Sequence, residues 1–234
     1  MIGRDSASLE GETVLVISLG LPMLAGMAEG LTARGATVVT LDDAALGESV
    51  ETVEDALNAA LGETAPALVV LSLLTAQATA IAPLEETTLE TWKQAASDPI
   101  RIVMRVLTAL GRRMKPAGCG AVVFVAPSLS LVGGAGLIGL TTALEGQRGL
   151  MKSTARQWGA SGVTVNWLAA APRALSDHFE AVDLAAKGDA VPVALGRRPV
   201  ADEIAGMAAW LAGSAGRSVT GATLMIDGGE WMVP

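Results

Sequence analysis

Short runs of apolar residues alternate along the chain with longer segments in which apolar residues recur at helical spacing. The short runs are rich in valine, leucine and isoleucine and show no polar alternation, which is typical of strands buried on both faces. The longer segments have the spacing of helices with one apolar side. We predict strands at residues 14–17, 37–41, 68–73, 121–125, 163–168 and 222–226, and helices at 24–31, 50–61, 88–114, 137–158 and 201–211.

The alternation of strands and helices indicates the fold class. Parallel strands need crossover connections, and the intervening helices supply them. We therefore predict a single-domain α/β fold over residues 1–234, a doubly wound parallel sheet of six or seven strands. In such sheets ligands bind beyond the carboxyl ends of the strands, so the turns at those ends are where chemistry is expected. The predicted core includes Ile17, Val38, Val70, Val123, Val165 and Leu224.

Composition and charge narrow the possible partners. Of the 234 residues 51% are hydrophobic and 17% are charged, and no linker-like stretch divides the chain. The 24 acidic side chains outnumber the 16 basic ones, which gives a net charge of -8 at pH 7. Such a charge repels phosphate backbones and anionic membrane surfaces. We expect neither nucleic acid nor a membrane as a partner.

Two uncharged stretches, residues 64–84 and 116–144, are long enough to raise the question of a membrane span. Both contain prolines, so each is better explained as a buried strand followed by a loop. Acidic residues precede the first apolar run, where a secretory signal would carry positive charge. The single cysteine, Cys119, cannot form an internal disulfide, and the single histidine offers no metal cluster. We expect a cytoplasmic protein without a metal.

Several motifs follow one another in a fixed order. Residues 195–199 read LGRRP, residues 202–205 read DEIA, residues 219–229 read VTGATLMIDGG, and residues 162–166 read GVTVN. Together with the sequence GATVV at residues 35–39, they resemble the short-chain dehydrogenase/reductase family, most closely its 3-oxoacyl carrier-protein reductase branch. The resemblance covers essentially the whole chain. It implies a Rossmann-type fold, an NAD(P) cofactor and an active site of Tyr, Lys, Ser and Asn.

The residues at the cofactor turn depart from the family pattern. In the family, a Thr-Gly-x-x-x-Gly-x-Gly turn lets the backbone approach the cofactor pyrophosphate, because side chains would occupy the ligand's volume. The three glycine positions hold Ser18, Pro22 and Leu24 here. Pro22 lacks an N–H donor, and Leu24 puts a bulky apolar group at the crevice. Gly20 and Gly26 lie nearby, and a different register of the turn remains an alternative.

The ribose-binding position is the other candidate contact to a cofactor. Asp42 corresponds to the carboxylate that holds the ribose hydroxyls in NAD-using members. It can also be explained as a solvated residue at the end of a strand, which we favour. Between Asp42 and the strand at residue 68 there are too few residues for the helix and strand that wall the family's adenine pocket. We expect no bound cofactor, and NAD if there is one.

None of the family's catalytic groups is present. The chain contains no tyrosine at all. In the alignment that the motifs fix, Leu140 takes the place of the family's Tyr and Leu144 that of its Lys, while Pro127 replaces the Ser and Pro99 the Asn. Loss of a general acid alone lowers a rate by about a hundred to ten thousand-fold. The resemblance therefore implies a family member without the family's chemistry.

Neighbouring side chains offer poor substitutes. A serine or threonine hydroxyl needs an adjacent base to react, and none is evident in the sequence. Lys152 lies eight residues beyond Leu144, which is roughly 12 Å along a helix and too far to replace the missing lysine. His178 could act alone as a base, although a single histidine in a surface loop is more often only solvated. The hydroxyls concerned are Ser128, Ser130, Thr141 and Thr142.

The replaced positions have structural explanations. Leu140 and Leu144 are four residues apart, so they should be buried together on one face of a helix. Asp98 and Pro99 have the pattern of a helix start, with Asp as N-cap and Pro at the first position. We therefore predict that the long helical segment at 88–114 breaks at this point.

Three functional hypotheses follow from the resemblance. The first, which we favour, is a catalytically degenerate family member that serves as a non-catalytic subunit beside an active NAD(P)-dependent oxidoreductase paralogue. The second is an active alcohol or ketone (hydroxyacyl-type) oxidoreductase with atypical residues. The third is a small-molecule binder or sensor whose apolar crevice takes a small apolar or acyl-thioester ligand.

The subunit hypothesis predicts an oligomer. In the family, the helices that match residues 99–114 and 137–158 form a four-helix bundle about a two-fold axis. Apolar residues nearly encircle the first of these helices, and a second apolar side requires a second cover. We expect a homo-oligomer or a hetero-oligomer with an active paralogue. The encircling residues are Ile102, Val103, Val106, Leu107 and Leu110.

Overall fold

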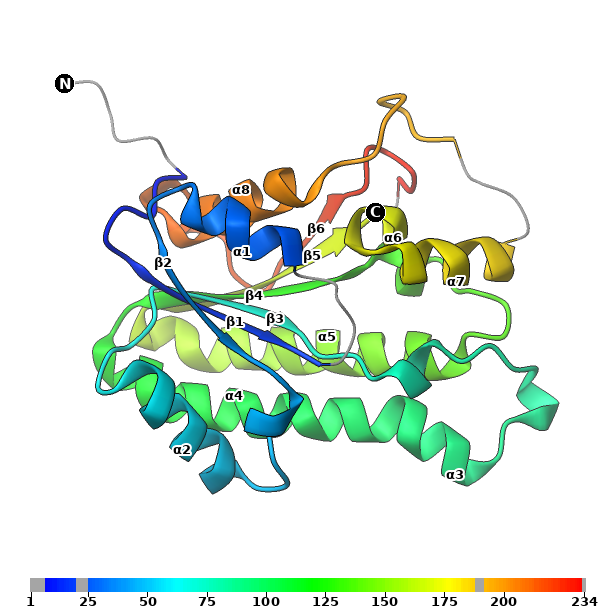
Figure 1. Cartoon of the computed structure of the whole chain (residues 1–234), viewed down its shortest axis with the longest axis horizontal. Coiled ribbons are helices and arrows are strands. Elements are labelled where there is room, and N and C mark those ends of the chain that lie inside the picture. Colours follow the sequence, from blue (N-terminus) through cyan, green and yellow to red (C-terminus); the bar gives the residue numbers. More distant parts are fainter. Residues whose placement is uncertain (1–6, 20–24, 188–191, 233–234) are drawn as a thin grey trace.

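Within the part of the chain that the structure describes, six parallel strands form one sheet in the order β2-β1-β3-β4-β5-β6 (Figure 1). The computed structural model describes residues 7–19, 25–187 and 192–232. In parallel register, Val14 pairs with Val38 on one side and with Leu68 on the other. The predicted doubly wound parallel sheet is therefore confirmed. The strands are β1 (Thr13–Ser18), β2 (Thr37–Leu41), β3 (Leu68–Ser72), β4 (Gly120–Pro127), β5 (Val163–Ala170) and β6 (Thr223–Ile226).

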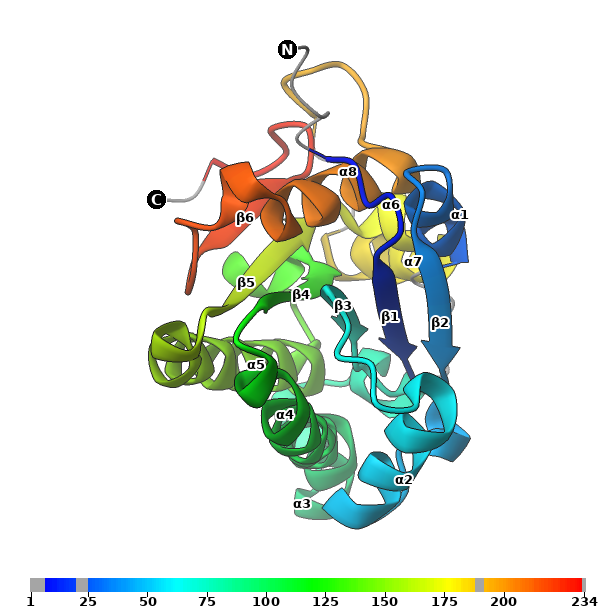
Figure 2. The same ribbon diagram turned by 90° about the vertical axis from the view of Figure 1, so that its left-hand side faces the viewer.

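Helices cover both faces of the sheet. Figure 2 shows α1 and α8 on one face and α2, α4 and α5 on the other. In the described part of the chain, no helix is long and apolar enough to cross a membrane. The helices are α1 (Ala25–Thr32), α2 (Val50–Leu61), α3 (Leu89–Trp92), α4 (Asp98–Ala117), α5 (Ile138–Trp158), α6 (Pro172–Leu175), α7 (Asp177–Lys187) and α8 (Ala201–Ala212).

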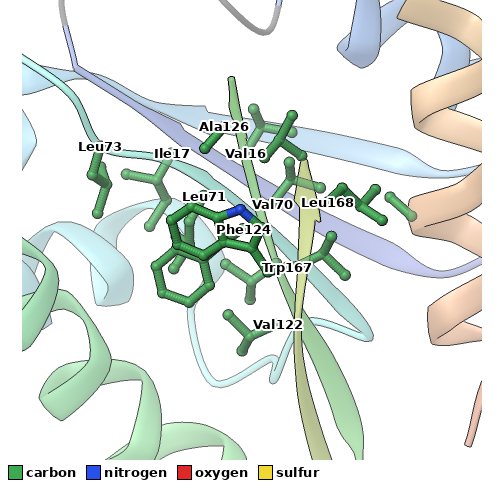
Figure 3. Packing of buried hydrophobic residues seen from close by; sticks show 14 of the residues in the cluster. Val16, Ile17, Val70, Leu71, Leu73, Val122, Phe124, Ala126, Trp167 and Leu168 are labelled. Atoms are coloured by element: carbon green, nitrogen blue, oxygen red, sulfur yellow. The ribbon is translucent and has the colours of Figure 1, made fainter. Parts of the chain in front are cut away.

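The core lies between the inner strands and the helices on both faces. Phe124 of β4 stacks on Trp167 of β5 with their ring centroids 5.4 Å apart (Figure 3). The four predicted core residues on inner strands are fully buried: Ile17, Val70, Val123 and Val165. The prediction was wrong for two others, because β2 and β6 are the edges of the sheet. Val38 and Leu224 are accordingly only half-buried.

The helix break predicted at Asp98 and Pro99 was also wrong. Residues 89–117 remain helical throughout, and a π-helical turn at Lys93–Ser97 joins α3 to α4. The Asp98 N–H bonds to the carbonyl of Lys93. This wider turn shifts the hydrogen-bond pattern by one residue just before Pro99, which has no N–H of its own. The chain therefore passes the proline without ending the helix.

The apolar residues of α4 are buried within the subunit. Val103, Val106 and Leu110 are fully buried, and Leu107 is 4% exposed. Met104 is the large hydrophobic residue of α4 that lies exposed. The predicted second apolar side of this helix was wrong, because these side chains are already buried where α2 and α5 pack against it.

Gly26 of α1 has a packing role. A Cβ atom on Gly26 would lie 2.7 Å from the Cβ of Ala201, and one on Gly30 would lie 2.9 Å from that of Ala205. Contacts this short cannot be accommodated, so both glycines let α1 approach α8 closely. Gly26 is thus explained by a helix–helix contact.

The motifs of the carboxyl-terminal third hold the fold together. Arg197 of LGRRP forms a bidentate ion pair with Glu203 of DEIA, at 2.8 and 2.9 Å. Asp227 is 2% exposed, and its carboxylate accepts hydrogen bonds from the Gly229 and Trp231 N–H groups. These motif residues fix the start of α8 and the turn after β6.

Acid should remove the stabilisation that Glu203 gives to α8. The Arg197 guanidinium and then the Val200 N–H lower the Glu203 pKa from 4.5 to about 2. The carboxylate therefore stabilises the fold above pH 4.5, and this contribution is lost as the pH falls from 4.5 to about 2. We expect Glu203→Gln to lower the melting temperature at pH 7 and to leave it unchanged near pH 2. Glu63→Gln, on the exposed surface, should follow the wild type at both pH values; a constant deficit for Glu203→Gln would contradict this account.

Asn166 ties β5 to the segment before β6. Its side chain is fully buried, donates to the Val219 carbonyl at 2.8 Å, and accepts from the Ala222 N–H at 3.1 Å. Asn166→Leu would leave both backbone groups unpaired, so we expect a loss of about 2–4 kcal/mol in the free energy of unfolding. Urea denaturation measures it. Thr108→Ala on the exposed side of α4 should change it by less than about 0.5 kcal/mol, and an equal effect of both substitutions would refute the assignment.

Candidate functional site

The candidate site lies at the carboxyl edge of the sheet, where four neighbouring strands end. Ser18 of β1 pairs with Ser72 of β3, and Pro127 of β4 pairs with Ala170 of β5. Doubly wound sheets bind their ligands beyond this edge. The side chains around it therefore decide what chemistry the chain can perform.

The helix that passes this edge presents apolar side chains at the two key positions. Leu140 and Leu144 of α5 are both fully buried, as their spacing predicted. Pro127 is the last residue of β4, and Pro99 lies buried in the first turn of α4. None of the four can donate, accept or stabilise a proton in a reaction. The four residues that the alignment assigns to the family positions therefore carry no reactive group.

Two serine hydroxyls lie just after β4. Ser128 is fully buried and Ser130 is 9% exposed, both in the 3-10 turn Ser128–Leu131. Within the described residues, neither hydroxyl has a hydrogen-bond partner. A serine nucleophile needs a base at hydrogen-bond distance. These serines therefore do not replace the missing catalytic group. Thr141 does not either, since its hydroxyl bonds to the Leu137 carbonyl at 2.9 Å.

The only histidine is tied to the edge by a threonine. His178 is exposed on α7, and its Nε2 lies 2.8 Å from Oγ1 of buried Thr79. The Thr79 hydroxyl donates its single hydrogen to the Ala76 carbonyl at 2.8 Å, so Nε2 of His178 acts as the donor. The contact therefore holds α7 against the turn after β3.

Sequence reasoning missed this contact because His178 was expected in a solvated loop. That expectation was wrong: the residue lies on a helix and has a partner 99 positions away. One local signal was available. Phe179 and Val182 are three residues apart, as on one face of a helix, and both are buried.

Gln147 was also missed as a residue of the edge. It is 1% exposed, one turn beyond Leu144 on α5, and its Nε2 donates to the Leu73 carbonyl at 2.9 Å. Leu73 directly follows β3. The bond fixes α5 against the end of this strand, so Gln147 serves the packing of the edge.

The cofactor side of the edge is described in part. Ser18 is half-buried, and the N–H of the next residue, Leu19, donates to the Ser72 carbonyl at 3.2 Å. Gly20, Pro22 and Leu24 lie outside the described residues.

Asp42 sits at the exposed end of β2. Its Oδ1 accepts a hydrogen bond from the Ala44 N–H at 3.2 Å, so the carboxylate caps the turn that follows the strand. This favours the interpretation as a solvated strand-end residue. In the described chain no strand pairs with the outer side of β2, although α2 is present. The outer wall of an adenine pocket therefore lacks its strand.

A metal site is not found in the described ranges, where no three His, Cys, Asp or Glu side chains lie close enough to hold an ion. Cys119 is a free and exposed thiol. The described part of the edge thus contains hydroxyls, one tethered imidazole, the Gln147 amide, the Asp42 carboxylate and apolar side chains, and none of the hydroxyls has a catalytic base as its partner.

Comparison with known proteins establishes the family. The family model described as enoyl-(acyl carrier protein) reductase matches residues 8–230. The chain therefore belongs to the short-chain dehydrogenase/reductase family. The fold, the parallel sheet and the motifs that suggested this resemblance all agree with the match.

Relatives of known activity cover nearly the whole chain. The 3-oxoacyl-[acyl-carrier-protein] reductase FabG of Salmonella typhimurium is 30% identical, over 97% of this chain and 100% of that protein. D-threitol dehydrogenase of Mycolicibacterium smegmatis is 27% identical, over 94% and 93%.

Solved structures agree in fold. A dehydrogenase/reductase from Sinorhizobium meliloti superposes with a TM-score of 0.71 at 26% identity, over 96% of this chain and 97% of that chain. A structure from Beutenbergia cavernae that contains NADP has the same TM-score at 24% identity, over 97% of this chain and 99% of that chain. The second likeness concerns the fold alone.

Proposed function

We propose that this chain is a catalytically degenerate member of its family and acts as a non-catalytic subunit beside an active NAD(P)-dependent paralogue in the cytoplasm. One observation carries the proposal. The positions of the family's proton donor and of its lysine hold Leu140 and Leu144, and both side chains are fully buried in the core. Burial of leucine at both positions stabilises the scaffold by about 1.5–3 kcal/mol per side chain. Selection for a stable scaffold without chemistry fits a structural partner.

The α4–α5 surface supports the assembly part of the proposal. A groove of about 750 Å³ runs between the two helices, with exposed Met104 and half-buried Leu150 among its lining residues. The resembling family assembles through the matching helices. Leu107 and Leu110 cannot serve to test this contact, because an aspartate at either buried position would unfold the subunit itself.

A second candidate function is the binding of a small apolar ligand. A pocket of about 220 Å³ lies between the turns after β3, the end of α3 and the start of α5. Trp92, Ile138 and three alanines form its apolar lining, and its polar lining residues are Gln77, Glu86, Thr87, Thr91 and Gln94. A fatty acyl thioester or a similarly apolar molecule would suit this lining, and binding would be compatible with a subunit role.

Co-expression tests the subunit function. The tagged chain is produced together with intact family members encoded in the same genome, and the recovered complexes are weighed by native mass spectrometry. We expect one intact member to form a stoichiometric complex. Met104→Ser removes apolar area from the groove and should weaken that complex roughly tenfold or more. Leu84→Ser, at an exposed apolar site outside the groove, should not.

Two results would contradict the subunit function. If no intact member forms a complex and the purified chain oxidises or reduces a carbonyl substrate with NAD(P)(H), then the hypothesis of an active oxidoreductase with atypical residues replaces the subunit function. If the chain is instead an inactive monomer that binds an acyl thioester in the 220 Å³ pocket, the binder hypothesis replaces it.

A further inference from the structure

We propose that the α4–α5 surface binds the acidic surface of a different protein and disfavours a second copy of this chain. The inference rests on the proposed function, because it names the kind of partner that the subunit surface fits. Three features of the molecule support it: the distribution of charge, the exposed cations without an ion pair among the described residues, and the shape of this surface. They are independent of the catalytic positions.

Charge is divided unevenly over the molecule. The two helices α4 and α5 contain eight of the 16 basic side chains and only two of the 24 acidic ones, Asp98 and Glu145. They therefore carry a net charge of +6, and the rest of the chain carries -14. Two of the eight cations, Arg105 and Arg113, bond to backbone carbonyls near the ends of α2. The other six make these helices the basic part of an acidic protein, whose field steers an acidic partner towards them.

Several of these cations have no ionic partner. Arg112 pairs with Glu54 of α2 at 2.9 Å, and Arg148 pairs with Glu145. In the described part of the molecule, four further exposed cations on these helices form no ion pair, namely Arg101, Lys115, Lys152 and Arg156. We call these four residues the basic set. Their charges are available to a partner.

The shape of the surface fits another helix. Lys152, Ser153 and Arg156 form an exposed ridge on α5, with the 750 Å³ groove on the α4 side and a second groove of about 820 Å³ on the side of Gly221. Gly149 is exposed one turn before Ser153 and has open space around it. A ridge of small and basic residues between two grooves lets helices of a partner approach closely on both sides.

A second copy of the chain would meet the same charges. In an isologous contact the basic set of one copy faces the basic set of the other. Neither acidic residue of the two helices can compensate, because Glu145 is paired with Arg148 and Asp98 lies 3.4 Å from Lys93. Like charges across an interface suppress that pairing. A partner with acidic residues on the matching helices would gain from each contact.

Nucleic acid and anionic membranes are weaker candidates. The remaining charge of -14 repels both at long range. The exposed Met104 in the groove also favours a partner with apolar side chains to bury. A protein that combines acidic and apolar residues on a helical surface meets both demands.

A charge-reversed variant tests the inference. Lys152→Glu with Arg156→Glu lowers the net charge by four, and so does the control variant Ser214→Asp with Arg217→Glu and Ser218→Asp, which changes exposed residues after α8. Each is co-expressed with the intact family members of the same genome. We expect the wild type and the control to form the complex and the reversed variant to bind at least tenfold more weakly. Salt should weaken the wild-type complex between 50 and 500 mM NaCl.

The other possible results would contradict either the charge inference or the subunit function. If the reversed variant binds the same partner as well as the wild type does, the subunit function stands and the charge inference fails. If no intact member binds, the subunit function itself fails. The inference is also overturned if the wild type alone sediments as a dimer that the reversal dissociates. Retention of the wild type, but not of the reversed variant, on duplex DNA or on phosphatidylserine vesicles would equally overturn it.

Discussion

Replacing Leu144 with lysine should lower the free energy of unfolding by about 4–5 kcal/mol at pH 7, because the penalty at this pH is limited by its distance from the pKa of a free lysine. The side chain is fully buried in α5, and burial shifts the pKa of a lysine down by roughly 3–5 units, at about 1.4 kcal/mol per unit. The folded chain would therefore hold the amine uncharged, while the unfolded chain binds a proton. This protonation penalty is largest below the lowered pKa of the buried amine, falls as the pH rises between the two pKa values, and disappears above about 10.4.

Urea denaturation at pH 7 and near pH 10 measures this effect. Leu144→Met conserves volume and should cost less than about 1.5 kcal/mol at both pH values. A lysine variant as stable as the methionine variant at pH 7 would show that position 144 reaches solvent. The position would then have the exposure that a catalytic lysine needs, and the argument from burial would fail.

The elements of the fold could be predicted from the sequence, because the burial pattern of a strand or helix shows in the local periodicity of apolar residues. Each of the six strands and the helix of residues 50–61 were predicted close to their observed positions. The sequence did not indicate which strands lie at the edges of the sheet. The segment Thr37–Leu41 has the apolar character of a strand, and Val38 is half-buried because no described strand pairs beyond β2. Whether a strand lies at an edge depends on segments that are distant in the sequence, and the periodicity of the strand itself does not indicate it.

The candidate site was predictable where it depends on the alignment of motifs. Leu140 and Leu144 were expected to be buried together, and they are. Contacts between distant segments gave no such signal. The bond between His178 and Thr79 joins residues from two separate crossovers, and the π-helical turn before Pro99 depends on a hydrogen bond that propensity alone does not indicate.

The distribution of charge was hidden in the whole-chain total. A net charge of -8 argues against anionic partners, yet it conceals two helices with a net charge of +6. The same helices were expected to attract a partner through apolar residues that prove to be buried in the subunit, such as Val106 and Leu110. Only the structure separates the side chains that pack inside from those, such as Lys152, that face outward.

Cofactor affinity should be at least about a thousandfold weaker than the micromolar binding of a functional nicotinamide site, a difference of about 4 kcal/mol. Pyrophosphate binding depends on backbone N–H groups at a glycine turn, and the three glycine positions hold Ser18, Pro22 and Leu24. Pro22 removes a donor outright. The lysine that would contact the ribose is replaced by Leu144, and Asp42 already caps its own turn.

Isothermal titration calorimetry of the purified chain with NAD⁺, NADH, NADP⁺ and NADPH tests the central claim most directly, because no member of this family transfers hydride without such a cofactor. An intact family member titrated in the same buffer serves as the positive control. We expect no saturable heat with any of the four nucleotides, which means dissociation constants weaker than about 1 mM. A micromolar dissociation constant for any one of them would contradict the non-catalytic assignment.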